Sequence, residues 1–157
     1  MPTEHPAIIR FRDEHARLGG SGEIVILPES VHTAALAAEA LGCEVGAIAN
    51  SLVFDDHGTP VLILTSGAHR VDTAKTAETI GAGRLARAKP EFVKEQTGQV
   101  IGGVAPIGHP APVPTYIDSW LKKYDVLWAG AGIPAAVFST SYDELVAMTG
   151  ATGIEVE

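Results

Sequence analysis

SLVFDDHGTPVLILT, residues 51–65, contains two runs rich in β-branched and aromatic side chains around a polar, glycine-containing centre at positions 55–59. This pattern is typical of a β-hairpin, because such side chains favour strands and the glycine region favours a tight turn. The two strands of a hairpin are antiparallel, whereas helical patterns separate most of the other strand-like runs. We therefore expect a mixed β-sheet.

Helical and strand patterns alternate on both sides of the hairpin. We expect a helix within residues 3–19, a strand at 23–27 and a short helix that begins at Thr33 and ends at Gly42. After the hairpin we expect a helix from Asp72 to Gly81, a strand at 84–88 and a helix at 90–96. Strand-like runs follow at 115–118, 125–130 and 135–140, and a Ser141/Glu144 capping box precedes a helix that ends at Gly150.

This order of elements predicts one domain of the α/β (α+β) class. The domain is expected to span residues 1–157, with residues 1–20 as an N-terminal helix, and a chain of this length can bury a full hydrophobic core. Hydrophobic residues make up 46% of the sequence. Cys43 is the single cysteine, so no internal disulfide can form, which fits a reducing compartment.

Charge and hydropathy limit the classes of partner. The longest apolar runs, such as residues 61–64, are far shorter than a membrane helix, and the N-terminal stretch contains acidic residues, unlike a secretory signal. We therefore expect a cytoplasmic protein that does not bind a membrane. The formal net charge of -8 argues against a protein that coats duplex DNA.

Positive charge is nevertheless concentrated in one segment. Between positions 70 and 94, six basic residues stand against Asp72, Glu78 and Glu91. The basic residues are Arg70, Lys75, Arg84, Arg87, Lys89 and Lys94. This excess is typical of a solvated protein face, and it would equally suit a small phosphate-bearing partner.

Common cofactor and metal motifs are incomplete. The glycine-rich stretches GAGRLA (81–86) and GAGIPA (130–135) do not lead from a strand into a helix, as a dinucleotide site requires. The six histidines form no close ligand pair, so we expect neither a cofactor nor a metal. Ser66, His69 and Asp72 are residue types found in catalytic triads, but no Gly-x-Ser-x-Gly turn accompanies them.

The stretch GQVIGGVAPIGHP, residues 98–110, is poor in ionisable groups and rich in glycine and proline. Both residues weaken helices and strands, so this stretch is predicted to be a loop. It could be a structural crossover between strands. Alternatively, its glycines would let backbone N–H groups approach a carbonyl or an oxyanion, as in acyl-transfer sites.

Several motifs occur together in a characteristic order. They are AEALGCEVGAIANSLVF (38–54), LTSGAHRVD (64–72), TGQVIGGVAPIGHP (97–110), YID (116–118), WAGAGIP (128–134) and VFSTSYDELVAMTGA (137–151). This set resembles the YbaK/ProX family of aminoacyl-tRNA deacylases, which is related to the editing domain of bacterial prolyl-tRNA synthetase. The resemblance implies a strongly curved mixed sheet surrounded by short helices. It also implies hydrolysis of the ester that joins a wrong amino acid to the 3′-terminal adenosine of a tRNA.

The resemblance implies a site and partners. The family's Gly-x-x-x-Pro loop matches residues 102–106, whose main chain would face the substrate carbonyl, and the turn at 130–132 would close the other side of the pocket. The implied catalytic residues are Asn50, Gly102, Gly103, Val104 and Pro106. The implied substrate-binding residues are Thr33, Ser51, Ser66, Gly67, His69, Arg70, Gly130 and Gly132. The expected partners are the tRNA 3′ acceptor end and a prolyl-tRNA synthetase.

One position departs from the family pattern. Most members have a lysine in the IAxSLVF segment where this chain has Asn50. Asparagine keeps a hydrogen-bond donor but not the charge, so His69 or Arg70 would have to supply a cation. An asparagine at a strand start can instead satisfy the backbone of a neighbouring turn.

Three functions follow from this sequence. The first is a trans-editing hydrolase for tRNA-Pro that carries alanine or cysteine. The second is a catalytically weak or inactive module of the same fold that binds tRNA or an amino acid. The third is a hydrolase of small acyl esters unrelated to tRNA.

Overall fold

A computed structural model describes residues 5–28, 31 and 33–157. The strands are β1 (Ile24–Ile26), β2 (Ile48–Asp56), β3 (Thr59–Ser66), β4 (Ala86–Arg87), β5 (Thr115–Asp118), β6 (Leu127–Gly130), β7 (Ala136–Thr140) and β8 (Thr152–Ile154). The helices are α1 (Pro6–Arg17), α2 (Ala34–Leu41), α3 (Thr73–Ile80), α4 (Pro90–Thr97) and α5 (Tyr142–Thr149), with 3-10 turns η2 (Val45–Ala47) and η3 (Ser119–Lys123). The predicted helices and strands are therefore confirmed, except that residues 1–4 lie outside the described part. β8 and the two 3-10 turns were not predicted.

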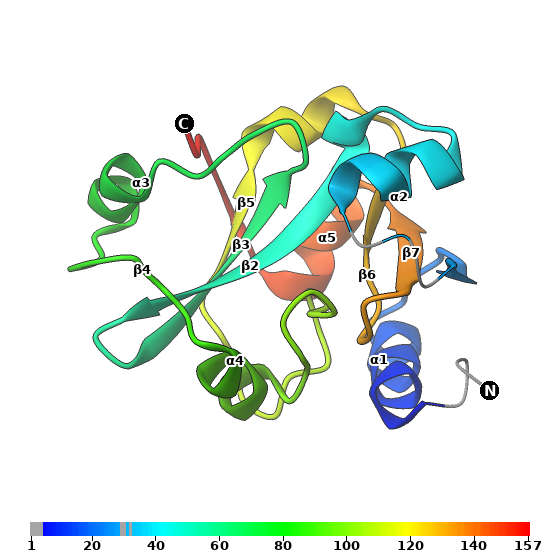
Figure 1. The fold of residues 1–157 in the computed structure, drawn as a ribbon, viewed down its shortest axis with the longest axis horizontal. Helices are drawn as coiled ribbons and strands as arrows, with labels where there is room; N and C mark the ends of the chain where they lie inside the picture. The colour runs from blue at the N-terminus through cyan, green and yellow to red at the C-terminus, as the bar shows by residue number, and fades with distance from the viewer. Residues whose placement is uncertain (1–4, 29–30, 32) are drawn as a thin grey trace.

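The predicted hairpin lies at the centre of a mixed sheet (Figure 1). The strand order is β1-β7-β6-β2-β3-β5-β8, and β4 pairs with β2. Strands β2 and β3 are antiparallel and are joined at His57 and Gly58, which both have a positive φ, as a two-residue type I′ turn requires. The pairs β2–β6, β3–β5 and β5–β8 are parallel. The expectation of a mixed sheet is confirmed.

The edge of β2 that faces away from β3 is only partly paired. It pairs with β6 at Ile48 and Ala49, and with β4 at Phe54 and Asp55. Between these contacts, no strand of the described residues pairs with residues 50–53 on that side. The sheet therefore has an opening beside the middle of its longest strand.

The two faces of the sheet are covered by different helices. Ile8 and Phe11 of α1 and Leu145 of α5 are fully buried in the main core, together with Leu62 of β3 and Phe138 of β7. A second cluster packs α2 against Ile48 on the other face, and Figure 1 shows α2 in front of the sheet and α5 behind it. Burial of each large apolar side chain contributes about 1.5–3 kcal/mol to stability.

The glycine- and proline-rich loop at residues 98–110 is held from inside by Gln99. This side chain is 2% exposed; its Oε1 accepts a hydrogen bond from the Ala105 N–H at 2.7 Å, and its Nε2 donates to the Ile107 carbonyl at 3.3 Å. The hydroxyl of Thr97 accepts from the Gln99 N–H at 3.1 Å. The buried side-chain amide of Gln99 therefore satisfies two backbone groups of this loop, in the way that a neighbouring strand would in a sheet.

His109 closes the same loop. Its Nε2 lies 2.8 Å from the Ala105 carbonyl, which fits a neutral imidazole that donates from Nε2. Burial lowers the pKa of His109 below its ordinary value, and the charge of Arg10 adds to this effect, while the hydrogen bond to Ala105 opposes it.

Glycines allow this loop to touch a second loop at backbone distance. A Cβ on Gly103 would lie 2.7 Å from both the Ile133 carbonyl carbon and the Pro134 nitrogen. A Cβ on Gly130 would lie 2.7 Å from the Val104 oxygen. Any larger residue at either position would push the two loops apart.

We predict that Gln99→Leu destabilises the protein, because leucine leaves the buried Ala105 N–H and Ile107 carbonyl without partners. Each such group costs about 1–3 kcal/mol. Urea unfolding measures the loss, and Gln96→Leu, on the half-exposed surface of α4, is the matched control. Equal stabilities of the two variants would show that Gln99 does not hold the loop.

We also predict an acid-sensitive contribution from His109. Because its folded-state pKa is depressed, its contribution is complete above the unfolded-state pKa of about 6.5 and is lost as the pH falls through the folded-state pKa. His109→Gln keeps an amide donor but does not titrate. The variant should therefore lose less stability than the wild type between about pH 7.5 and about pH 5, measured by urea unfolding. Identical losses would contradict this prediction.

Candidate functional site

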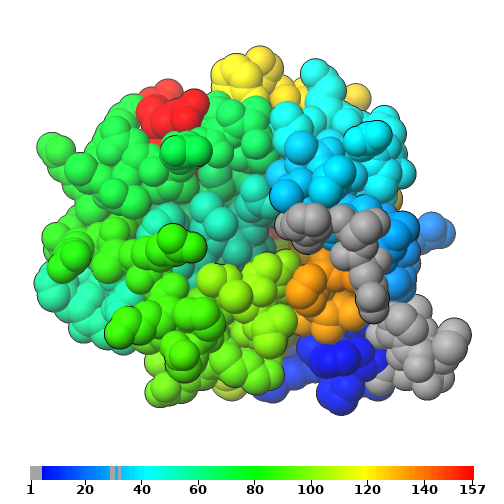
Figure 2. Space-filling view, viewed as in Figure 1, coloured from blue at the N-terminus to red at the C-terminus, as the bar shows by residue number. Residues whose placement is uncertain are grey.

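A cavity of about 650 Å³ lies at the opening in the sheet beside residues 50–53. Its walls come from β2, α2, α4, the loop at 101–104 and the segment at 128–137, and most of them are apolar. Figure 2 looks onto this face, where the yellow-green loop, teal β2 and the orange segment meet. A cavity of this size and character suits a small ligand or one end of a larger one.

Six of the predicted site residues line this cavity, although they come from four separate segments. They are Thr33, Asn50, Ser51, Gly102, Val104 and Gly130. Thr33 also caps α2 by accepting a hydrogen bond from the Leu36 N–H at 3.1 Å. The structure thus brings the strand, the glycine loop and the second glycine turn to one place.

Asn50 lies on β2 opposite Thr65 and is half-buried. Within the described residues its side-chain amide makes no hydrogen bond, so it does not satisfy a neighbouring turn. Its donor and its acceptor are available to a ligand in the cavity.

Ser51 is the next residue along the cavity wall. Its Oγ is buried and has no hydrogen-bond partner among the described residues. A buried hydroxyl without a partner is costly, and a bound ligand or water can satisfy it. Ser51 is therefore a candidate contact for a polar group of a ligand.

The main chain of the glycine loop offers fewer free donors than its sequence suggested. The Gly103 N–H donates to the Val100 carbonyl at 2.9 Å and closes a turn in which Gly102 has a φ of 86°. The Ala105 N–H is bound by Gln99, and proline has no N–H. Within the described residues, the N–H groups of Gly102 and Val104 are without such a bond and lie in the cavity wall.

Gly103, Pro106 and Gly132 lie behind the cavity wall. Gly103 and Pro106 are buried, and neither lines the cavity. Gly132 has a φ of 110°, and a Cβ there would lie 2.7 Å from the Ala7 oxygen of α1. The two glycines support the wall because they allow close packing of the main chain.

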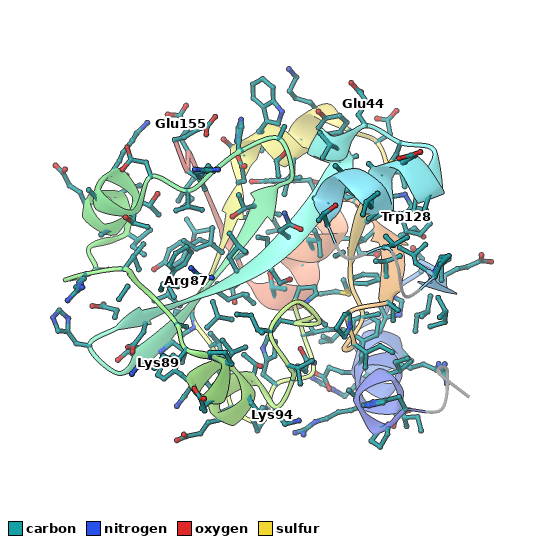
Figure 3. The ribbon with its side chains drawn as sticks, viewed as in Figure 1. Glu44, Arg87, Lys89, Lys94, Trp128 and Glu155 are labelled. Carbon is teal, nitrogen blue, oxygen red and sulfur yellow. The ribbon has the colours of Figure 1, made fainter. Side chains whose placement is uncertain are left out.

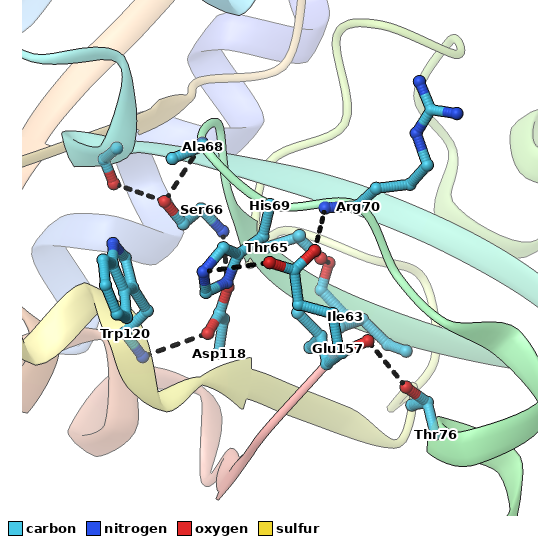
Figure 4. Close-up of polar contacts among 12 residues, drawn as sticks. Ile63, Thr65, Ser66, Ala68, His69, Arg70, Thr76, Asp118, Trp120 and Glu157 are labelled. Atoms are coloured by element: carbon cyan, nitrogen blue, oxygen red, sulfur yellow. Dashed lines mark hydrogen bonds and ion pairs between the residues drawn. The ribbon is translucent and has the colours of Figure 1, made fainter.

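Ser66 and Gly67 lie outside the cavity wall, at the end of β3. The Ser66 Oγ donates to the Gly46 carbonyl at 2.7 Å, and its N–H donates to Asp118 Oδ2 at 3.1 Å (Figure 4). A Cβ on Gly67 would lie 2.4 Å from the Val45 oxygen. The Ser66 hydroxyl is thus occupied by main chain and is not placed as a nucleophile.

His69 and Arg70 also lie outside the cavity. His69 Nδ1 lies 2.8 Å from Asp118 Oδ2, and its ring lies 4.9 Å from that of Trp120. The Arg70 N–H donates to Glu157 Oε2 at 3.1 Å. The expectation that either residue brings a cation to Asn50 is therefore not supported.

The charged side chain in the described cavity wall is that of Arg87. Among the described residues that line the cavity, Arg87 is the one with an ionisable side chain. The sequence analysis included Arg87 in the basic excess at 70–94, but it did not predict that Arg87 lies at this site.

The described residues include no cluster of three or more histidine, cysteine or acidic side chains able to hold a metal ion. No helix in this part of the chain is long and apolar enough to cross a membrane.

Comparison with known sequences identifies relatives. The family of aminoacyl-tRNA editing domains matches residues 28–148. YwhH of Bacillus subtilis, which is uncharacterised, is 36% identical over 97 residues, and the match covers 61% of each chain. EbsC of Enterococcus faecalis, named as a candidate Cys-tRNA(Pro)/Cys-tRNA(Cys) deacylase, is 27% identical, with 76% of this chain and 73% of EbsC covered. A proline–tRNA ligase of Maridesulfovibrio salexigens is 32% identical over 49% of this chain and 13% of the ligase.

Solved structures share the fold. A crystal structure described as a candidate trans-editing enzyme for prolyl-tRNA synthetase is 41% identical, covers 97% of both chains and superimposes with a TM-score of 0.91. The hypothetical protein APE2540 is 28% identical, with a TM-score of 0.83 over 94% of this chain and 98% of APE2540. The resemblance in the sequence motifs and the predicted fold class are both confirmed. The chain belongs to the family of aminoacyl-tRNA editing domains.

Proposed function

We propose that this protein is a trans-editing hydrolase that releases a wrong amino acid, alanine or cysteine, from tRNA-Pro. The observation that carries the proposal is that Asn50, Ser51, Gly102 and Val104 all line one apolar cavity. Among the described residues, the Ser51 hydroxyl and the N–H groups of Gly102 and Val104 have no hydrogen-bond partner. The names of the relatives, which refer to Cys-tRNA(Pro) and to prolyl-tRNA synthetase, support the same substrate class.

The N–H groups act on the carbonyl of the aminoacyl ester. Hydrolysis places negative charge on this oxygen, and preorganised main-chain donors in an apolar cavity stabilise that charge. Removal of one such donor typically costs about 2.7–4 kcal/mol in other hydrolases. Gly102 and Val104 would supply two donors whose positions are fixed by the Val100–Gly103 bond and by Gln99.

Water is the nucleophile in this proposal. Arg87 is the one ionisable side chain among the described lining residues, and a guanidinium does not act as a base at neutral pH. The ribose hydroxyl next to the ester would therefore help to position the water. Asn50 would orient the substrate through its amide, without removing a proton.

Selection among amino acids would be steric. The inner wall includes Ala37, Ala49 and Ala136, which are all buried and have no polar side-chain atoms. An apolar pocket discriminates one methylene by only about 1–3 kcal/mol. A small side chain such as that of alanine fits this requirement.

A second candidate is a non-catalytic module that binds the acylated tRNA end. Asn50 favours it, because this residue brings no charge to the position where most relatives are expected to have lysine. Under this alternative, the cavity holds the aminoacyl group without cleaving it.

A panel of aminoacylated tRNAs separates the two candidates. We expect purified protein to release amino acid from Ala-tRNA-Pro or Cys-tRNA-Pro faster than the uncatalysed rate, and to spare Pro-tRNA-Pro. No release from any member of the panel would overturn the hydrolase. If Asn50→Lys then restored release to the inert protein, the binding module would be favoured.

Ser51 gives a sharper test of the site. Ser51→Ala should leave the free energy of unfolding unchanged or slightly higher, because the lost hydroxyl had no partner. The same variant should lower kcat/KM for deacylation about 3- to 10-fold, as expected for one lost hydrogen bond. Ser119→Ala, outside the cavity on η3, is the matched control. Unchanged kcat/KM in Ser51→Ala would remove Ser51 from the site.

A further inference from the structure

We propose that Arg87 binds the phosphodiester of the terminal nucleotide, and that a hollow between α3 and β4 guides the single-stranded end of the nucleic acid into the cavity. This inference rests on the proposed function, because it assigns the part of the substrate that lies outside the cavity.

The hollow is a second depression on the surface, more open than the cavity. It is lined by Phe54, by Thr73, Ala74, Ala77 and Glu78 of α3, and by residues 82–87. Phe54 and Arg87 also line the cavity, and they are direct partners in the pairing of β2 with β4. The two depressions therefore meet at this pair of side chains.

The guanidinium of Arg87 is available to a ligand. Arg87 is exposed, and its side chain makes no hydrogen bond or ion pair within the described part of the chain. Arg84 lines the same hollow, and Glu78 is the one acidic residue among its described lining residues. Figure 3 shows Arg87 and Lys89 close to β4, on the side that leads toward α4.

A nucleic-acid end has the chemistry that these residues recognise. A guanidinium binds a phosphodiester through two parallel hydrogen bonds, which an ammonium cannot reproduce. Phe54 is half-buried, lines both depressions and is the cross-strand neighbour of Arg87, so an aromatic side chain lies at the same place as the cation. A cation next to an aromatic ring is the usual combination for single-stranded nucleic acid, in which a base stacks while its phosphate is paired.

The positive side chains of the hollow stand out against the charge of the whole chain. The formal net charge is -8, whereas Arg84 and Arg87 line the hollow beside a single described acidic residue, Glu78, so a phosphate is attracted here. An acceptor end that approaches here would place its terminal ester at the cavity mouth, next to Phe54 and Arg87. Arg87 is thus a positioning residue, one step removed from the reacting bond.

Binding of the ribo-trinucleotide CCA, without an amino acid, tests this inference independently of hydrolysis. We expect Arg87→Gln to weaken binding about tenfold and to reduce the slope of log K against log salt by about 0.7, the value for one phosphate on a single strand. Binding of adenosine, which has no phosphate, should not change. Arg70→Gln is the matched control, since Arg70 is an exposed arginine outside both depressions.

Trinucleotide binding that is equal in Arg87→Gln and the wild type would overturn the inference. Hydrolysis adds a second readout: the variant should raise KM for the acylated tRNA by a much larger factor than KM for alanyl-adenosine, which has no phosphate. An equal loss on both substrates would contradict a phosphate contact. If the wild type cleaves nothing but trinucleotide binding still depends on Arg87, the phosphate site stands and the proposed hydrolysis fails.

Discussion

The site depends on the contact between two loops that touch through their main chains. Gly103 lies against Ile133 and Pro134, and Gly130 lies against the carbonyl of Val104, at distances that a side chain at either glycine would prevent. Because the loops meet at backbone level, this contact holds the neighbouring residues Gly102 and Val104 in the cavity wall. Gln99 supports the loop at residues 98–110 through buried hydrogen bonds to Ala105 and Ile107.

The contact between the two loops lies beside the opening in the sheet, where the cavity is found. Strand β2 changes partners from β6 to β4, and the interval leaves room for a cavity lined from both faces of the sheet. Ile48 packs with α2, whereas the next residue, Ala49, belongs to the main core, and both reach the cavity. Polar interactions in such an apolar space are stronger than in water. In the proposed function, a few hydrogen-bond donors would therefore be enough to hold and polarise an ester.

Local features of the fold could be predicted from the sequence because their causes lie within a few residues. Asp72 and Ser141 cap α3 and α5 through hydrogen bonds to the N–H groups of Lys75 and Glu144. Only one half of the predicted capping box is formed. The Ser141 hydroxyl accepts from the Glu144 N–H, whereas the Glu144 carboxylate accepts hydrogen bonds from the hydroxyls of Ser21 and Thr140.

Parts of the candidate site that depend on distant residues could not be predicted in this way. His69 pairs with Asp118, 49 positions later, and lies outside the cavity wall. The occupied N–H of Gly103 and the place of Arg87 at the mouth also require the tertiary fold. The family resemblance predicted that Asn50, Gly102 and Gly130 belong to one site, and the composition of the sequence alone would not have grouped them.

Where the hydrogen-bond donors of a site belong largely to the peptide backbone, the surrounding side chains can be exchanged during evolution without loss of those donors. In the proposed function, the side chain at position 50 would therefore be one that can change, and alter the substrate preference, while the fold remains the same.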